Sequence, residues 1–437
     1  MSTSTAVAPP ARSRSGPAGL PRLLQGCQPD RAMPLVEHVD HHGPLPGFGR
    51  SRRATPLIDL VEAAGLRGRG GAAFPVATKL RAVAGGRRRS VVLVNGSEGE
   101  TLSAKDRLLL RSLPHLVLDG ATLAAEAVGA DTIVVGVDRL ADDAQWAVSR
   151  AVAERARIDP LVATVLTVPP RYVAGEETAL VNLVNGGDAK PTFTPPRPFE
   201  RGVRGRPTLV QNVETLAHLA LIARHGADWF RQLGTHDEPG SMLVTVSGAV
   251  PRASVCEVAL GAPLLDAIDA AGGATCAIGA VLVGGFFGAW LPAETARTLA
   301  MTNAALRAAG GALGSGIVYA FPADECGLVA TADAARALAA ESAGQCGPCV
   351  HGLAALADAI GDVAAGRDVA HATARIHRVA EQVRGRGACR YPDGVLRFVE
   401  SALVAFAPEV HRHAVDHGCR LAAPTPLPVQ HSSGGWR

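Results

Sequence analysis

Three cysteines near the end of the chain offer the clearest chemistry in the sequence. Cys346 and Cys349 form a Cys-x-x-Cys pair where a helix is expected to begin, and Cys389 follows after a further helical stretch. Thiolates gathered in this way hold a metal ion or an iron–sulfur cluster. A cubane cluster takes about four protein ligands, but the position three residues before Cys346 is Ala343. The pattern therefore predicts an electron-transfer site that lacks one ligand.

Two other uses of these thiols are open. Zinc could be held by the three cysteines together with His351. A redox dithiol of the thioredoxin type is disfavoured, because that motif follows a strand and this one lies in a helical region. The remaining cysteines are expected to be isolated and inert, and Cys326 or Cys419 would join the site only if the fold brings it near; this set is Cys27, Cys256, Cys276, Cys326 and Cys419.

A run of glycines lies far upstream of these cysteines, in the first part of the sequence. Glycine occupies positions 65, 68, 70 and 71, with Arg67 and Arg69 between them. Glycines let the backbone approach a flat ring or a phosphate, and arginines can neutralise phosphate charge. The run is not the Gly-x-Gly-x-x-Gly fingerprint that follows a strand, so an ordinary dinucleotide site is not supported.

Two acidic pairs stand in loops after expected strands. They are Glu98 with Glu100, and Glu176 with Glu177. Ligands bind beyond the carboxyl ends of strands in α/β sheets, where carboxylates can hold ribose hydroxyls and disfavour an extra phosphate. The alternative is that all of them are solvated loop acids.

A further polar pair, Gln211 and Asn212, could bond a heterocycle edge or cap the helix that follows, and the two roles are compatible. The acid and bases of Lys105-Asp106-Arg107 are expected to form structural ion pairs. Histidines near the two ends, including His38 and His413, are expected to be solvated.

Composition narrows the class of protein. The 437 residues carry a net charge of +3 and only 4% aromatic side chains, which gives no case for nucleic-acid binding. Eight cysteines are too few for a disulfide scaffold, and their clustering favours a reducing cytoplasm. No apolar run reaches the roughly 18–20 residues of a membrane span. The Ser-, Ala-, Pro- and Arg-rich beginning could be read as a transit peptide, but a disordered tail is expected.

The periodicity of apolar residues predicts three successive regions of different secondary structure. Helix and strand alternate up to about residue 240, short strands with one helix follow, and the chain is helical from residue 331. The domains expected are a tail at 1–50, an α/β domain at 51–240, a small β-rich domain at 241–325, a helical bundle at 326–410 and a tail at 411–437. The strands expected include Ser90–Val94, Thr132–Val137, Met242–Val246 and Ala280–Val283, and the last helices Ala332–Glu341, His351–Ile360, His371–Val383 and Val395–Phe406.

Several long segments, taken in order from Thr55 to Glu409, resemble one family. It is the flavin-bearing, NADH-oxidising subunit of respiratory complex I, with the diaphorase subunits of NAD-linked hydrogenases and formate dehydrogenases. The resemblance is carried by Gly65–Pro75, by Asn95–Arg107, by the near-verbatim Gly175–Leu180, by Pro207–Leu216 and by Leu313–Gly316.

The resemblance implies an α/β fold made of a Rossmann-like FMN-binding domain, a ubiquitin-like β-grasp domain of the SLBB type and a helical bundle for an iron–sulfur cluster. It implies FMN with NAD(H) stacked on it, and electrons leaving one at a time through the cluster. The cofactor residues implied are Gly68, Arg69, Gly70, Gly71, Phe74, Lys79, Asn95, Glu98, Glu100, Tyr172, Gly175, Glu176, Glu177, Gln211 and Asn212, and the metal ligands are Cys346, Cys349 and Cys389.

The chain departs from the family at functional positions. Ala343 replaces the first cluster cysteine, Asn95-Gly96-Ser97-Glu98 replaces Asn-Ala-Asp-Glu, and Arg197 replaces the aromatic of a Pro-Pro-Phe-Pro stretch. The cluster could be [3Fe–4S], or [4Fe–4S] with water, Cys419 or another ligand in the fourth position, or it could be lost. Arg197 makes NADPH conceivable, although Glu176 and Glu177 argue against an extra phosphate.

The function expected is that of an enzyme: an FMN-dependent oxidoreductase moving electrons between NAD(P)H and an iron–sulfur partner. That partner would be a ferredoxin-like or thioredoxin-like [2Fe–2S] protein, or a membrane redox protein to which this cytoplasmic chain docks. The alternative is a non-catalytic electron-relay or assembly module with degenerate NADH and cluster sites.

Overall fold

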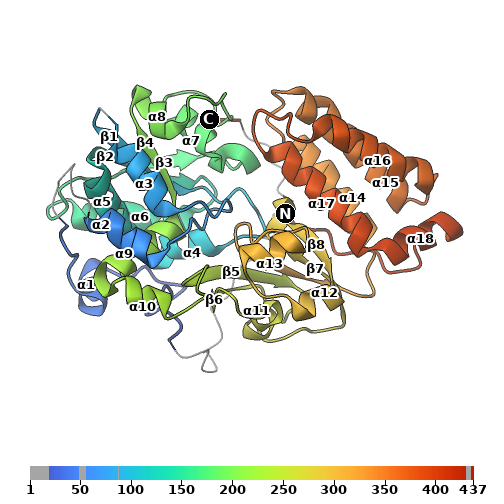
Figure 1. The fold of residues 1–437 in the computed structure, drawn as a ribbon, viewed down its shortest axis with the longest axis horizontal. Helices are drawn as coiled ribbons and strands as arrows, with labels where there is room; N and C mark the ends of the chain where they lie inside the picture. Colours follow the sequence, from blue (N-terminus) through green and yellow to red (C-terminus); the bar gives the residue numbers. More distant parts are fainter. Residues whose placement is uncertain (1–18, 49–55, 87, 430–434) are drawn as a thin grey trace.

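Three folded parts follow one another in the computed structural model, which describes residues 19–48, 56–86, 88–429 and 435–437. In Figure 1 the blue-to-green α/β part lies on the left, the yellow part with the second sheet lies below the centre, and the orange-to-red helices lie on the right. The expected sequence of α/β, β-rich and helical layers is confirmed.

A four-stranded parallel sheet forms the centre of the first part. Its strands are β1 (Ser90–Gly96), β2 (Ala130–Asp138), β3 (Thr164–Val168) and β4 (Thr208–Asn212), in the order β3-β2-β1-β4. The run Val91–Val94 has no exposed surface, as expected for a strand covered on both faces. Because the strands are parallel, Asn95 pairs with Asn212 at the same carboxyl edge, and ligand-binding loops gather there.

Helices cover both faces of this sheet. Two of them, α5 (Pro114–Val128) and α9 (Val213–His225), cross so closely that a Cβ on Gly120 would lie 2.0 Å from the Leu216 carbonyl oxygen. The other helices of this part are α1 (Leu35–His42), α2 (Pro56–Ala64), α3 (Val76–Ala84), α4 (Lys105–Ser112), α6 (Asp142–Arg155), α7 (Glu177–Val184), α8 (Pro198–Arg201) and α10 (Ala227–Arg231).

The middle part is a five-stranded mixed sheet of order β6-β5-β9-β7-β8. Its strands β5 and β9 are parallel while the other pairs are antiparallel, which is the arrangement expected of a β-grasp domain. The elements are β5 (Ser241–Gly248), β6 (Ser254–Ala259), α11 (Leu264–Ala270), β7 (Ile278–Val283), β8 (Ala289–Pro292), α12 (Ala293–Thr298), α13 (Asn303–Ala308) and β9 (Ile317–Pro322). Sequence periodicity missed β8 and β9.

The last part is a bundle of α14 (Gly327–Ala340), α15 (Leu353–Ala364), α16 (Val369–Val383), α17 (Tyr391–Ala405) and α18 (Ala407–Asp416). Its apolar core is shared with the middle part, because Phe286, Trp290 and Phe321 are buried in the same cluster. Edge-to-face contacts join Trp290 to Phe406 at 5.2 Å and Phe286 to Phe398 at 5.6 Å. The shared core fixes the bundle against the second sheet.

The two expected tails are the main errors of the sequence-based prediction. Of the first, residues 1–18 lie outside the described residues, but the segment 19–48 is folded: Leu23 is fully buried and the backbone N–H groups of Arg22 and Leu23 donate to Glu257. Of the second, α18 continues to Asp416 and His413 has no exposed surface. Both segments are held by partners far away in the sequence, so local composition could not reveal them.

None of the helices in the described ranges combines the length and the apolar character needed to cross a bilayer.

Candidate functional site

A cavity of about 640 Å³ opens where the three parts meet. This volume is within the range that holds a cofactor-sized ligand. Most of the residues expected to bind cofactors line it, namely Gly68, Gly70, Gly71, Phe74, Lys79, Asn95, Glu98, Glu100, Tyr172, Gly175, Glu176, Glu177, Gln211 and Asn212. The middle part adds Gly284, Phe287 and Gly314, and the helical part adds Cys389, Arg390, Tyr391 and Arg397.

The glycine run forms one wall of the cavity. The Gly68 N–H donates to the Phe74 carbonyl over 2.9 Å, which closes the run into a tight loop. A Cβ on Gly70 would lie 3.2 Å from the Asn212 Cβ, and Gly71 has φ +109°. Gly71 therefore has a backbone conformation that favours glycine, and a side chain on Gly70 would press tightly against Asn212. Phe74 remains 52% exposed beside the cavity, so its ring is available for stacking.

Arg69 differs from its neighbours because it does not line the cavity. Its guanidinium is buried, with Nη2 donating to the Ser241 carbonyl over 3.0 Å and Nε 3.9 Å from the Glu214 carboxylate. Burial lowers the pKa of Arg69, against the opposing effect of Glu214. The side chain expected to touch a cofactor instead fastens the glycine loop to strand β5.

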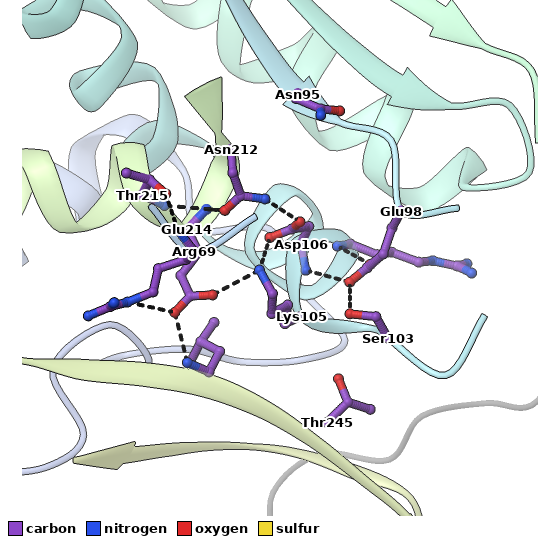
Figure 2. A network of polar contacts seen from close by, with 12 residues as sticks. Arg69, Asn95, Glu98, Ser103, Lys105, Asp106, Asn212, Glu214, Thr215 and Thr245 are labelled. Carbon is purple, nitrogen blue, oxygen red and sulfur yellow. Dashed lines mark hydrogen bonds and ion pairs between the residues drawn. The ribbon is translucent and has the colours of Figure 1, made fainter. Parts of the chain in front are cut away.

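A buried polar network lies behind the loop (Figure 2). Lys105 has no exposed surface, and its Nζ lies 2.8 Å from both the Asp106 and the Glu214 carboxylates. Burial alone would lower the pKa of Lys105, but the charges of Asp106 and Glu214 outweigh it and raise the pKa above its ordinary value. The expected structural ion pairing of Lys105 is confirmed.

Asn212 connects this network to the cavity. Its Oδ1 accepts from the N–H groups of Glu214 and Thr215, which makes it the N-cap of α9. Its Nδ2 donates to Asp106 over 2.6 Å. The capping role is confirmed, and it fixes the side chain in a single orientation at the cavity wall.

Two carboxyl groups in the loop after β1 lie half-buried at the cavity. Glu98 accepts from Ser103 Oγ over 2.5 Å and from the N–H groups of Asp106 and Arg107. Glu100 accepts from the Tyr172 phenol over 2.5 Å and from the Phe286 N–H over 2.9 Å. Burial raises the pKa of each carboxyl group to about 7. Neither is a solvated loop acid, and each can gain or lose a proton near neutral pH.

The second acidic pair divides into two roles. Glu176 caps α7 by accepting from the N–H groups of Thr178 and Ala179, and burial raises its pKa. Glu177 lies between two cations, 3.2 Å from Lys79 Nζ and 3.4 Å from Arg197 Nη1. Arg197, which stands where an aromatic was expected, therefore neutralises part of the charge of Glu177.

Asn95 and Ser97 show that the cavity suits a polar ligand. Asn95 Nδ2 donates to the Gly175 carbonyl over 2.7 Å and so joins the two acidic loops. Ser97 lines the cavity, and its buried Oγ has no hydrogen-bond partner within the described residues. A buried hydroxyl without a partner is costly, so a ligand atom is the natural partner for it.

The three cysteines lie beside this cavity. Cys349 N–H donates to the Cys346 carbonyl over 3.0 Å in a turn at the start of α15, and Cys389 lines the cavity itself. Burial raises the pKa of the Cys349 thiol to about 12, so without a metal it stays protonated. Ala343 offers no ligand atom in the position where a fourth cysteine was expected.

The positions of the three sulfurs and of His351 bear on the choice between zinc and a cluster. Among the described residues, the three sulfurs are not within 4.8 Å of one another as a set, whereas sulfurs on one zinc ion are about 3.8 Å apart. His351, the expected fourth zinc ligand, is exposed. With His351 exposed and the three sulfurs not gathered within 4.8 Å, these residues do not form a compact zinc site. Cys419 is not near them: it lies with Cys326 and His413, which removes it as a fourth cluster ligand.

An aromatic group separates Glu100 from the cysteine loops. Tyr172 lies 4.7 Å from Phe287 and 5.4 Å from Tyr391 between ring centroids, and Tyr391 Oη donates to the Leu338 carbonyl over 2.6 Å. Sequence reasoning missed Phe287, Tyr391 and Arg397 as lining residues. The Gly284-Gly285 and Leu313–Gly316 turns were visible in the sequence, but nothing local marked these three.

Comparisons with known proteins agree with this geometry. Three family models match the chain: a Nuo51 FMN-binding domain at residues 61–221, an SLBB domain at 243–279, and the iron–sulfur binding region of NADH-ubiquinone oxidoreductase-F at 329–413. All three expected parts are represented.

Relatives of similar length carry one name. The F subunit of the NADH-quinone oxidoreductase of Streptomyces coelicolor is 29% identical over 412 residues, covering 89% of this chain and 90% of that protein. The protein of the same name from Rickettsia bellii is 32% identical over 313 residues, covering 68% and 75%. Among solved structures, an NAD+-reducing [NiFe]-hydrogenase in the H2-reduced state aligns with a TM-score of 0.76 at 30% identity, over 89% of this chain and 67% of that chain.

Proposed function

The chain belongs to the family of the NADH-quinone oxidoreductase F subunit, and from that premise we propose that it oxidises NADH on FMN and passes the electrons to an iron–sulfur partner. One observation carries the proposal. The glycine loop, the acidic loops and the Cys389 loop are walls of the same cavity, although they are separated by up to about three hundred residues of sequence. Such a cavity brings a hydride acceptor next to a one-electron acceptor.

The residues present fit FMN. The Gly68–Gly71 backbone offers a flat, close approach, Ser97 Oγ offers a free hydroxyl, and Gln211 and Asn212 line the same cavity, with the Asn212 amide fixed by its cap and by Asp106. When bound, FMN accepts two electrons together and releases them singly. The protein would hold the ring in place beside the half-buried carboxyl groups of Glu98 and Glu100.

We propose that the nicotinamide nucleotide binds at the exposed side of the cavity. Phe74 offers a ring for stacking, and Glu177 offers a carboxylate to ribose hydroxyls. Because Lys79 and Arg197 already engage Glu177, the carboxylate is oriented before the ligand arrives. A carboxylate at this place disfavours a 2′-phosphate, so NADH is the preferred donor.

We propose that Glu100 takes up and releases a proton during the reaction. Its carboxyl group holds a proton at about neutral pH, and the phenol of Tyr172 donates to Oε2. A group whose pKa lies near the working pH can release or take up a proton as charge changes in the cavity. Glu98, with a pKa of about 7, supports the same role from the other side of Gly99.

We propose that Cys346, Cys349 and Cys389 hold a cluster with three thiolate ligands, either [3Fe–4S] or [4Fe–4S] completed by a non-cysteine ligand. The free state of all eight cysteines fits a reducing cytoplasm. The electron acceptor would be a ferredoxin-like or thioredoxin-like [2Fe–2S] protein, and any membrane contact would come through that partner.

A second candidate is a relay or assembly module that has lost hydride chemistry, and Ala343 and Arg197 are the observations in its favour. The two are separated by measuring NADH-dependent reduction of ferricyanide and of a [2Fe–2S] ferredoxin. The proposal predicts that the purified chain reduces both, and that Cys389→Ser reduces ferricyanide alone. No NADH oxidation with either acceptor, in protein that carries flavin, would establish the second candidate instead.

A further inference from the structure

A second group of possible metal ligands lies away from the cavity. The Cys326 and Cys419 sulfurs and a His413 ring nitrogen all lie within 4.8 Å of one another. Cys326 is 1% exposed and His413 is fully buried. Sequence reasoning treated all three as isolated or solvated, yet the fold brings them together across 93 residues of chain between Cys326 and Cys419.

The histidine is oriented as a metal ligand. Its Nδ1 lies 3.1 Å from the Val363 carbonyl oxygen, which can only accept, so Nδ1 carries the hydrogen. Nε2 then presents its lone pair to the Cys326 sulfur, 3.6 Å away. A carbonyl that fixes the tautomer of a ligating imidazole is the usual outer partner of a metal-bound histidine.

From this geometry we propose a structural Zn²⁺ site formed by Cys326 Sγ, Cys419 Sγ and His413 Nε2. Zinc bonds of about 2.3 Å to sulfur and 2.0–2.1 Å to nitrogen, at tetrahedral angles, separate the ligand atoms by about 3.6 Å. The observed Cys326–His413 distance of 3.6 Å matches that value. Binding exchanges the two S–H bonds for Zn–S bonds and releases both protons to solvent.

The fourth position has a candidate beside it. Glu409 lies one helical turn before His413 on α18, and its Oε2 accepts from the Gly327 N–H over 3.0 Å. Its carboxylate is therefore held next to Cys326, outside the group of three, and can complete the tetrahedron through a water molecule. Two thiolates and an imidazole select zinc over the hard cations Mg²⁺ and Ca²⁺.

The site would fasten the end of the chain. Just beyond Cys419, the Ala422 N–H donates to Asp324 and its carbonyl accepts from the Cys326 N–H. The chain then returns to the first part, where the Trp436 ring lies 4.9 Å from both Arg171 and Lys190. Zinc would thus join the start of α14 to the segment that crosses back towards the cavity.

This group is separate from the three-cysteine site. His413 contacts Val363 near the end of α15, whereas Cys349 stands just before its start. The rise of an α-helix places these two ends roughly 20 Å apart. Loss of either site should therefore leave the other intact.

The test is elemental analysis of the full chain purified anaerobically with added ZnSO4. We expect one zinc per chain in addition to iron and flavin. Cys419→Ser, a half-buried position, should lose zinc and keep flavin and iron, while the Cys346→Ser/Cys349→Ser/Cys389→Ser triple variant should lose iron and keep zinc. Cys276→Ser, an exposed cysteine outside the group, is the matched control and should keep both metals.

A second readout covers variants that fold poorly. Co²⁺ added to the unmodified apo chain should give thiolate charge-transfer and tetrahedral d–d bands, and it should protect two thiols from alkylation, identified by mass spectrometry as Cys326 and Cys419. The inference is overturned by less than about a tenth of an equivalent of zinc, by zinc that survives Cys419→Ser, or by a Cys326–Cys419 disulfide in the anaerobic protein. Because these readouts need no NADH, they stand or fall independently of the proposed activity.

Discussion

The phenol of Tyr172 donates to the carboxylate of Glu100 over 2.5 Å, and both residues line the cavity that Cys389 also lines. The same Tyr172 ring contacts Tyr391, two residues after Cys389. A single pair thus links a proton-binding group of the cavity to the segment that carries Cys389, a proposed cluster ligand. Changes to Glu100 and to the buried network around it should therefore be measurable in both stability and activity.

Acidic pH should stabilise the flavin-free chain through Glu100. Its folded pKa of about 7 is above the ordinary value of 4.5, so the folded state binds more protons between these values. The contribution is fully present below about pH 4.5 and is lost as the pH rises through 7. In urea titrations, Glu100→Gln should remove about 2 kcal/mol of the difference between pH 5.5 and 7.5. An unchanged difference would contradict the assigned pKa.

Removal of Lys105 should be far more damaging than removal of a surface cation. Lys105→Met leaves the carboxylates of Asp106 and Glu214 buried without their cation, so we expect a loss of about 3–5 kcal/mol in the free energy of unfolding. Arg81→Ala breaks the exposed pairs with Asp59 and Glu62 and is the matched control, for which we expect a much smaller loss because water screens these charges. Similar losses for the two variants in chemical denaturation would show that the network is not energetically important.

Glu177 should control affinity for NADH. Glu177→Gln removes the carboxylate charge that Lys79 and Arg197 hold in place. We expect the KM for NADH to rise about tenfold with a small change in kcat. The preference for NADH over NADPH should fall. Glu294→Gln, on an exposed side chain of the middle part, should leave both constants unchanged. A fall in kcat without a change in KM would place Glu177 outside the nucleotide site.

Ala343→Cys should complete the cluster. A fourth thiolate in this position converts a three-thiolate site into a four-thiolate one, which favours a [4Fe–4S] cluster that resists oxidation. Iron per chain should rise or become stable in air, and the electron paramagnetic resonance signal of the reduced protein should change. Ser342→Cys, one residue earlier, serves as the control, and an equal effect from it would argue against a specific ligand position.

Local sequence patterns predicted the parts of the structure that depend on local chemistry. The strand at Ser90–Val94 and the cap at Asn212 follow from a buried apolar run and from side-chain capping, and both are present. The cofactor loops also lie on one cavity, as their resemblance to known motifs implied. The placement of Asn95 beside Asn212 could be predicted because parallel strands end at the same edge.

The remainder depended on contacts across long stretches of chain. Arg22 finds Glu257 across 235 residues, so its segment was taken for a tail. Arg69 turns away from the cavity because Ser241 and Glu214 offer buried acceptors that its own loop does not. Cys326, His413 and Cys419 converge only after the helical bundle has formed. Local sequence periodicity does not predict contacts between residues so far apart in the chain.

The most direct test of the proposed oxidoreductase activity is an absorption spectrum of the anaerobically purified chain, with flavin and iron quantified, before and after one equivalent of NADH. We predict FMN bound to each chain, iron present, and bleaching of the flavin band within the mixing time, followed by reduction of the cluster. Bound flavin whose spectrum is unchanged by either NADH or NADPH would contradict the oxidoreductase assignment.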